Sequence, residues 1–192
     1  MGHSQADKAA TRARVLRITS RKIRAEGVTR PAIADLMKEA GLTHGGFYKH
    51  FTSRDDLIAQ AAAVALTEGS AKLERAARGN ERSARDGLID AYLARRHRDR
   101  PATGCALVTL GAAAGRGDER LRQAYEKQVR AYLELIEGPD GDGRDAGAEA
   151  MLTLAALVGA VLMARAVADE DLSDELLETV ARRLRQPASE AS

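Results

Sequence analysis

AGLTHGGFYKHF, at residues 40–51, is the most informative segment of this chain. A tight turn at Gly41 leads into a very short helix, in which Phe47 and Phe51 lie four residues apart and share one face. We expect this face to be buried. The remaining side chains point outward and can donate hydrogen bonds or carry charge to a polyanion: Thr43, His44, Tyr48, Lys49 and His50.

The residues before this segment predict a second short helix, at 31–40. Its apolar residues Ile33, Leu36 and Met37 share one face. Two short helices joined by a glycine turn, the second with a polar free face, form the helix-turn-helix pattern.

Residues 42–51, followed by Ser53-Arg54-Asp55-Asp56-Leu57, resemble the signature of TetR-family transcriptional regulators. The resemblance covers roughly residues 10–58 and is weaker beyond them. It implies an all-α protein with a three-helix DNA-binding domain at 8–56 and a helical ligand-binding and dimerisation domain at 57–186. It also implies a homodimeric repressor that binds a palindromic operator and is released by a small molecule. Activation in place of repression stays open.

The resemblance also suggests which residues contact DNA. Members of the family usually carry a hydroxyl pair where this chain has Pro31-Ala32, so we expect Thr29 or Arg30 to supply that phosphate contact. Arg54 replaces the usual lysine and keeps its charge. The alternative for His44 is an ordinary surface residue. The full set of expected contacts is Thr29, Arg30, Thr43, His44, Gly45, Gly46, Tyr48, Lys49, His50 and Arg54.

Charge is distributed unevenly along the chain. Residues 1–60 hold 11 Lys and Arg against 6 Asp and Glu, whereas the remaining residues hold 19 against 22. The positive excess therefore lies on the segment with the helix-turn-helix pattern, as expected for phosphate contact. The arginines of the first helix are expected mostly on its outer side, where Arg12 is the best candidate to approach the DNA backbone.

Periodicity predicts about nine helices and no strand. We expect Ser53 and the segment Ser173-Asp174-Glu175 to cap two of them. The segment 148–168 is apolar on nearly every face, which favours burial between two copies of the chain. The expected helices are 8–26, 31–40, a very short one that ends at residue 51, 53–77, 81–99, 103–117, 118–137, 148–168 and 173–185.

The larger module is expected to hold the effector, and few aromatic residues favour a small or aliphatic one. Each candidate lining residue has core packing as its alternative role. Cys105 is also a candidate sensor, because a helix start and nearby arginines lower a thiol pKa. A repressor controlled by oxidation or electrophile modification of Cys105 is therefore the alternative mechanism. The candidate pocket residues are Leu88, Tyr92, His97, Cys105, Leu107, Tyr125, Val129, Met151 and Leu154.

Other protein classes are less favoured. An enzyme using His97 and Cys105 lacks a third orienting group, and Pro101 separates the two residues. An interaction adaptor with a degenerate helix-turn-helix is favoured only by Pro31-Ala32. The basic run at 95–100 is explained by the end of a helix rather than by a second nucleic-acid patch. We expect no cofactor, metal site or membrane span, and a cytoplasmic location.

Overall fold

The computed structural model describes residues 5–29, 31–117, 119–138 and 144–186, and this part of the chain is mostly helical. These ranges contain nine α-helices, two short 3-10 helices and no strand, which confirms the predicted all-α class. In chain order they are α1 (Gln5–Glu26), α2 (Ile33–Glu39), η1 (His44–Lys49), α3 (Arg54–Arg78), α4 (Ala84–Tyr92), α5 (Arg95–Asp99), η2 (Pro101–Thr103), α6 (Leu107–Arg116), α7 (Glu119–Glu137), α8 (Arg144–Ala166) and α9 (Glu170–Arg185).

A small apolar cluster joins α1, α2 and η1. Phe47 and Phe51 are buried in it, as predicted, and their ring centroids lie 5.7 Å apart. Gly41 makes the turn between α2 and η1 with φ of +68°, a left-handed conformation that glycine adopts without strain. Helix η1 is therefore held in place by Phe47 within it and by Phe51 just after it. The other members of this cluster are Val15, Leu36, Met37, Ala40 and Leu57.

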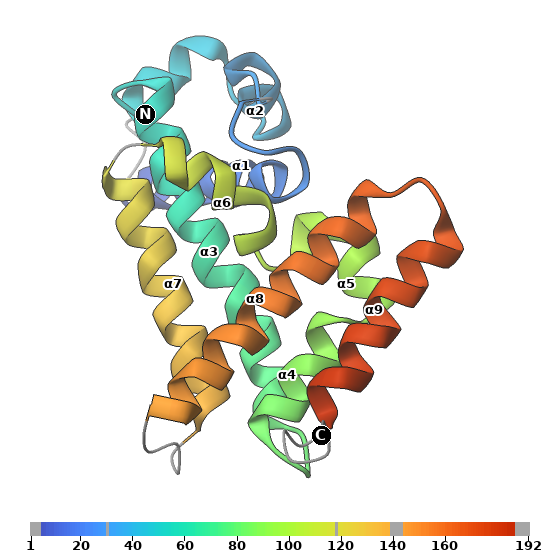
Figure 1. Cartoon of the computed structure of the whole chain (residues 1–192). Helices are drawn as coiled ribbons and strands as arrows, with labels where there is room; N and C mark the ends of the chain where they lie inside the picture. The colour runs from blue at the N-terminus through green and yellow to red at the C-terminus, as the bar shows by residue number, and fades with distance from the viewer. Residues whose placement is uncertain (1–4, 30, 118, 139–143, 187–192) are drawn as a thin grey trace.

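The long helix α3 connects this cluster to the rest of the molecule (Figure 1). It begins at a predicted cap, where the Ser53 hydroxyl accepts a hydrogen bond from the Asp56 N–H at 3.0 Å. Leu57, in its first turn, belongs to the small cluster, whereas Ile58 and the apolar residues after it belong to a larger one. Ile23 of α1 also belongs to the larger cluster, so the domain boundary near residue 57 stays a prediction.

The larger cluster lies among α3, α4, α6, α7, α8 and α9. In Figure 1, α8 runs diagonally across this bundle from α7 to α9. Tyr92 of α4 and Tyr132 of α7 are fully buried at its centre, with their rings edge to face at 6.2 Å. The core of the bundle thus joins helices from the middle of the chain to helices from its C-terminal part.

Residues 81–99 form two helices, α4 and α5, where one was predicted. The Tyr92 carbonyl, at the end of α4, is hydrogen-bonded to the His97 ring through Nδ1 at 2.6 Å. This side-chain contact replaces continuation of the helix. The helix predicted from residue 103 also begins later, at Leu107, because Pro101–Thr103 form the separate turn η2.

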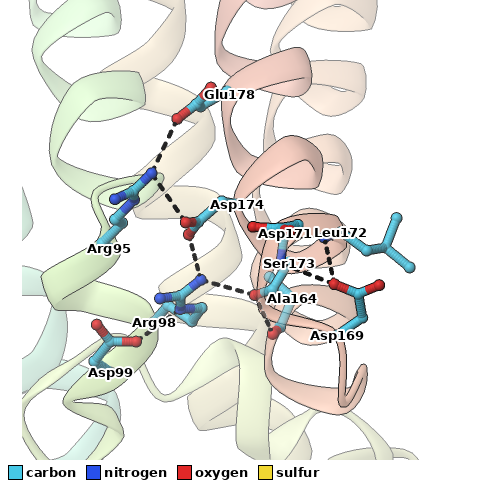
Figure 2. A network of polar contacts seen from close by, with 10 residues as sticks. All are labelled: Arg95, Arg98, Asp99, Ala164, Asp169, Asp171, Leu172, Ser173, Asp174 and Glu178. Atoms are coloured by element: carbon cyan, nitrogen blue, oxygen red, sulfur yellow. Dashed lines mark hydrogen bonds and ion pairs between the residues drawn. The ribbon is translucent and has the colours of Figure 1, made fainter.

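The predicted cap at Ser173 is wrong. Helix α9 begins at Glu170, and Asp169 caps it by accepting from the N–H groups of Asp171 and Leu172 at 2.9 and 3.1 Å (Figure 2). Ser173 is buried inside the helix, where its hydroxyl donates to the Ala164 carbonyl at 2.7 Å. The acidic residues Asp169, Glu170 and Asp171 therefore form the start of the last helix.

Helix α8 is long and apolar enough, by length and composition alone, to cross a membrane between residues 146 and 166. This property is weak evidence for a membrane span, because the core helix of a soluble protein can have the same length and composition. Here the helix packs against α7 and α9 and contributes to the buried cluster. The sequence-based expectation of no membrane-spanning segment therefore stays a prediction.

Arg24 joins α1 to the bundle, although the sequence placed it on the outer side of its helix. Its side chain is buried and donates to the carbonyls of Ala102, in η2, and Ala65, in α3, at 2.8 and 3.2 Å. Glu68 lies 3.6 Å from the guanidinium. In return, the Thr109 hydroxyl donates to the Arg24 carbonyl at 2.8 Å. Buried hydrogen bonds to charge are among the stronger ones, so α1 is firmly seated.

We expect Gly69→Ala to destabilise the protein by about 1–3 kcal/mol. A Cβ atom at Gly69 of α3 would lie 2.5 Å from the Gly104 carbonyl oxygen, which belongs to the backbone and has no side-chain freedom to move. Urea unfolding followed by circular dichroism measures the effect. Gly115→Ala is the control, because nothing lies within 4 Å of that position. Equal stability of the two variants would contradict the close approach.

Candidate functional site

The exposed face of η1 is the first candidate site. Tyr48 is 67% exposed, and Thr43 and Lys49 are also exposed. Tyr48 packs edge-on against Phe47, with ring centroids 5.1 Å apart. The structure thus places the phenol of Tyr48 and the ammonium group of Lys49 on the outer side of a short helix whose inner side is buried. Such a surface suits hydrogen bonding to a phosphate backbone.

The end of η1 is held by a network that sequence reasoning missed. Arg12 of α1 lies over the Phe51 ring, 5.4 Å from its centroid, and donates to the Gln60 side chain. Gln60 donates to Asp56 at 2.7 Å, and Asp56 also accepts from the Thr52 N–H at 3.0 Å. These hydrogen bonds, the one from Thr52 first, lower the pKa of Asp56. Arg12 therefore helps to position the end of η1, and its guanidinium already contacts Gln60 and the Phe51 ring.

Arg54 has a similar role. Its guanidinium donates to the carbonyls of Val28, Thr29 and Pro31 at 3.0, 3.2 and 3.4 Å. It thereby ties the start of α3 to the turn between α1 and α2. The side chain remains 38% exposed, so a phosphate contact stays a prediction, but much of its hydrogen-bonding capacity is used within the protein.

The two glycines of η1 leave open space beside the helix. A Cβ atom at Gly45 would meet nothing within 4 Å, and one at Gly46 would meet only Leu42 and Thr43 at ordinary contact distance. This is consistent with the expected close approach of a ligand to the backbone. Thr29 is also exposed. Two expected contacts, Arg30 and the side chain of His44, lie outside the described part of the chain.

His50 differs from its neighbours because its ring is partly buried. Its Nδ1 atom is buried without a hydrogen-bond partner among the described residues. Burial, followed by the positive charges of Lys8, Arg12 and Lys49, lowers the pKa of the ring below 6.5. His50 is therefore neutral at pH 7 and would contact DNA as a hydrogen-bonding group rather than as a cation.

Five of the nine predicted pocket residues lie together. They line an apolar hollow of about 400 Å³ between α6, α7 and α8, which is open to solvent on one side. Its size suits a small ligand. Leu133, Ala155, Val158 and Gly159 complete the lining and were not predicted. The five predicted members are Leu107, Tyr125, Val129, Met151 and Leu154.

The other four predicted pocket residues are buried in the core and do not line this hollow. Leu88 is plain apolar packing. Tyr92, His97 and Cys105 form a buried polar group, in which the Cys105 N–H donates to His97 Nε2 at 2.9 Å and the Tyr132 hydroxyl contacts the Cys105 sulfur at 3.4 Å. The nine predicted pocket residues are thus divided between the hollow and the core.

Cys105 does not have the reactive character that its sequence context suggested. The thiol is fully buried, and burial raises its pKa, although the hydroxyls of Tyr132 and Tyr92 act in the opposite direction. It also lies before the start of α6 rather than in its first turn. A buried, high-pKa thiol is less reactive toward oxidants and electrophiles. No cluster of metal-ligating side chains occurs among the described residues.

Comparison with known proteins gives a matching family model and solved structures with a similar fold. Residues 19–61 match the family model described as bacterial regulatory proteins, tetR family. The chain is similar to a solved TetR regulator from Chloroflexus aurantiacus J-10-FL, with 22% identity, a TM-score of 0.77, and 95% and 98% of the two chains covered. It is also similar to the reduced form of Escherichia coli NemR (22%, 0.74, 93% and 99%) and to a TetR-family regulator from Streptomyces coelicolor (26%, 0.65, 93% and 97%). A comparison with curated proteins gave no match.

The fold and the helix-turn-helix surface define a transcriptional regulator. Residues 19–61 thus resemble the N-terminal domain of the TetR family, and the chain has the fold of solved TetR-family regulators along almost its whole length.

We expect the stability of the protein to decrease by about 2 kcal/mol between pH 7 and pH 5 through His97 alone. Burial is the main reason that the pKa of this ring is lowered from 6.5 to about 4. The folded state therefore favours the neutral ring. Its stabilising contribution is complete above pH 6.5 and is lost as the pH falls from 6.5 toward 4.

Urea unfolding at the two pH values, for the wild type and for His97→Gln, measures this contribution. The variant is expected to be less stable at pH 7 and to lose less stability on acidification. His50→Gln is the control for the second histidine with a lowered pKa. An unchanged pH dependence in His97→Gln would show that the ring is not buried neutral.

Proposed function

We propose that this protein is a cytoplasmic repressor that binds a palindromic DNA operator as a homodimer and is released by a small-molecule effector. The observation that carries the DNA-binding part is the exposed face of η1, with Tyr48 and Lys49 outward and Phe47 and Phe51 locked inside. The positive excess of residues 1–60 supports it. Repression is the usual mode of the family that the sequence resembles.

The homodimer is supported by the exposed apolar side chains. Among the described residues, five of the six large apolar side chains that are exposed lie on α8 or α9, and the sixth is Tyr48 of η1. These two helices are neighbours (Figure 1). A contiguous exposed apolar face indicates a protein interface. The five residues are Met151, Leu152, Leu162, Met163 and Leu172.

A second copy of the chain is the occupant that best fits this face. Two-fold pairing would present two η1 segments to successive major grooves, about 34–36 Å apart, which explains why the operator is expected to be palindromic. The face also borders the apolar hollow, because Met151 belongs to both. An effector in the hollow would therefore act next to the dimer interface, where small shifts change the spacing of the two η1 segments.

Control through Cys105 is the less favoured mechanism. Its burial and raised pKa oppose reaction with oxidants, and Tyr132 already contacts the sulfur. We therefore propose reversible ligand binding as the signal.

Operator binding is expected to fail when the outward side chains of η1 are removed. In fluorescence anisotropy with DNA flanking the gene, Tyr48→Ala/Lys49→Ala should bind at least about tenfold more weakly than the wild type. Lys49→Ala alone should reduce the slope of log affinity against log salt by about 1, because one phosphate contact is lost. Lys127→Ala, an exposed lysine on α7, is the matched control. Wild-type affinity in the double variant would exclude η1 as the recognition segment.

Dimer formation is expected to depend on the exposed face of α8. Leu152→Glu/Leu162→Glu should weaken the dimer at least about 100-fold, because four apolar side chains per dimer are replaced by charges. Both side chains are more than half exposed in the single chain, so the monomer should keep its fold. Light scattering after size exclusion measures the mass, and Ala112→Glu on the exposed side of α6 is the control. A double variant that stays dimeric at micromolar concentration would place the interface elsewhere.

A further inference from the structure

The basic run Arg95-Arg96-His97-Arg98-Asp99-Arg100 divides into two sets with different surroundings. Arg95 and Arg98 face α9 (Figure 2). Arg95 pairs with Asp174 and Glu178 at 2.9 and 3.3 Å, and Arg98 pairs with Asp174 at 2.6 Å. These two arginines are thus neutralised by carboxylates and hold α5 against the last helix.

Arg96 and Arg100 are four residues apart and have a different environment. With Lys72 of α3, they line a partly enclosed cavity of about 90 Å³ between α3, α4, α5 and η2. No carboxylate lines this cavity. Within the described ranges of the chain, none of the three cationic side chains has an ion-pair or hydrogen-bond partner. The other lining residues are Leu73, Ala76, Ala91, His97, Thr103 and Gly104.

His97 does not offset this positive charge, and it adds none at neutral pH. Its Nδ1 atom contacts the Tyr92 carbonyl at 2.6 Å, and its Nε2 atom accepts from the Cys105 N–H at 2.9 Å. Both nitrogens are committed, and the ring is neutral. Burial is the main cause of its lowered pKa, and the positive charges of Arg165, Lys72 and Arg96, in that order, lower it further.

Lys72, Arg96 and Arg100 are exposed residues that border one small cavity. Like charges at its rim repel one another, and an anion between them reduces that repulsion. A guanidinium offers a planar fork that matches a carboxylate or phosphate group, and an ammonium adds a compact charge. The cavity volume corresponds to roughly three water molecules, which suits one such group and not a large ligand. The apolar side chains in the wall, Leu73, Ala76 and Ala91, lower the local dielectric constant and so strengthen the electrostatic attraction.

We propose that this cavity binds a small oxyanion, the carboxylate or phosphate group of a ligand, through Lys72, Arg96 and Arg100. The site is separate from the apolar hollow between α6, α7 and α8, with which it shares no lining residue. The effector, or a second effector, would then be a compound that carries a carboxylate or phosphate group.

The cavity also has a direct connection to the DNA-binding unit. Thr103 lies in η2 and Arg100 immediately before it, so one wall of the cavity is the turn whose Ala102 carbonyl accepts from Arg24 of α1. An anion that draws Arg100 toward α3 moves this turn. Because Arg24 attaches α1 to the turn, α1 moves with it. This regulatory part rests on the proposed function, whereas anion binding itself does not.

Titration calorimetry on the full chain without DNA tests the site, with inorganic phosphate and acetate added at constant ionic strength against sodium chloride. We expect binding of at least one of the two oxyanions to the wild type. Binding of phosphate alone would assign a phosphoryl ligand, and binding of both would assign a carboxylate-sized site. Arg96→Gln/Arg100→Gln should weaken binding at least about tenfold. Lys72→Gln, on an exposed side chain that is not needed for folding, should weaken it in the same direction.

Arg75→Ala is the matched control, since Arg75 is an exposed cation one turn from Lys72 that does not line the cavity. Absence of binding by both oxyanions, or equal binding by the wild type and the Lys72 and arginine variants, would overturn the proposal. Operator affinity is then measured with and without the anion that binds. A change that Lys72→Gln abolishes supports the regulatory part, and anion binding with unchanged operator affinity would overturn that part alone.

Discussion

The close approach of α3 to the turn at residues 100–105 is the constraint on which the rest of the molecule depends. Gly69 and Gly104 meet where neither has room for a side chain, because a Cβ on Gly104 would lie 2.6 Å from the His97 ring. Two further contacts hold the same turn: Arg24 donates to the Ala102 carbonyl, and His97 accepts from the Cys105 N–H. Because these contacts are buried or partly buried, the position of this turn sets the position of α1 relative to the bundle.

This arrangement explains why a helical bundle can communicate with a DNA-binding surface. Helix α1 packs under η1 through Val15 and against the bundle through Ile23 and Arg24. Helix α3 belongs to both apolar clusters in the same way. A shift at either helix is therefore transmitted through rigid elements rather than through a flexible linker, which is what coupling between two sites requires.

Charge plays two physically different roles in this structure. Arg12, Arg24, Arg54 and Arg98 are bound to protein acceptors and act as structural clamps. Lys49, Lys72, Arg96 and Arg100 have no such partner among the described residues and are available to anions. Sequence alone does not separate these groups, because both contain basic residues at helical spacing. The separation depends on which carbonyls and carboxylates the fold brings near each side chain.

The sequence by itself determined the all-α class, the burial of Phe47 and Phe51, the Ser53 cap and the outward face of η1, because these features depend on local spacing and on the chemistry of neighbouring residues. Tertiary structure alone decided the break between α4 and α5, the cap at Asp169, and the division of the predicted pocket between a hollow and the core. It also decided the buried position of Arg24 and the raised pKa of Cys105. Each of these depends on partners far away in the chain: the Tyr92 carbonyl meets a histidine ring, and Arg24 finds the Ala102 carbonyl, only after the helices have packed.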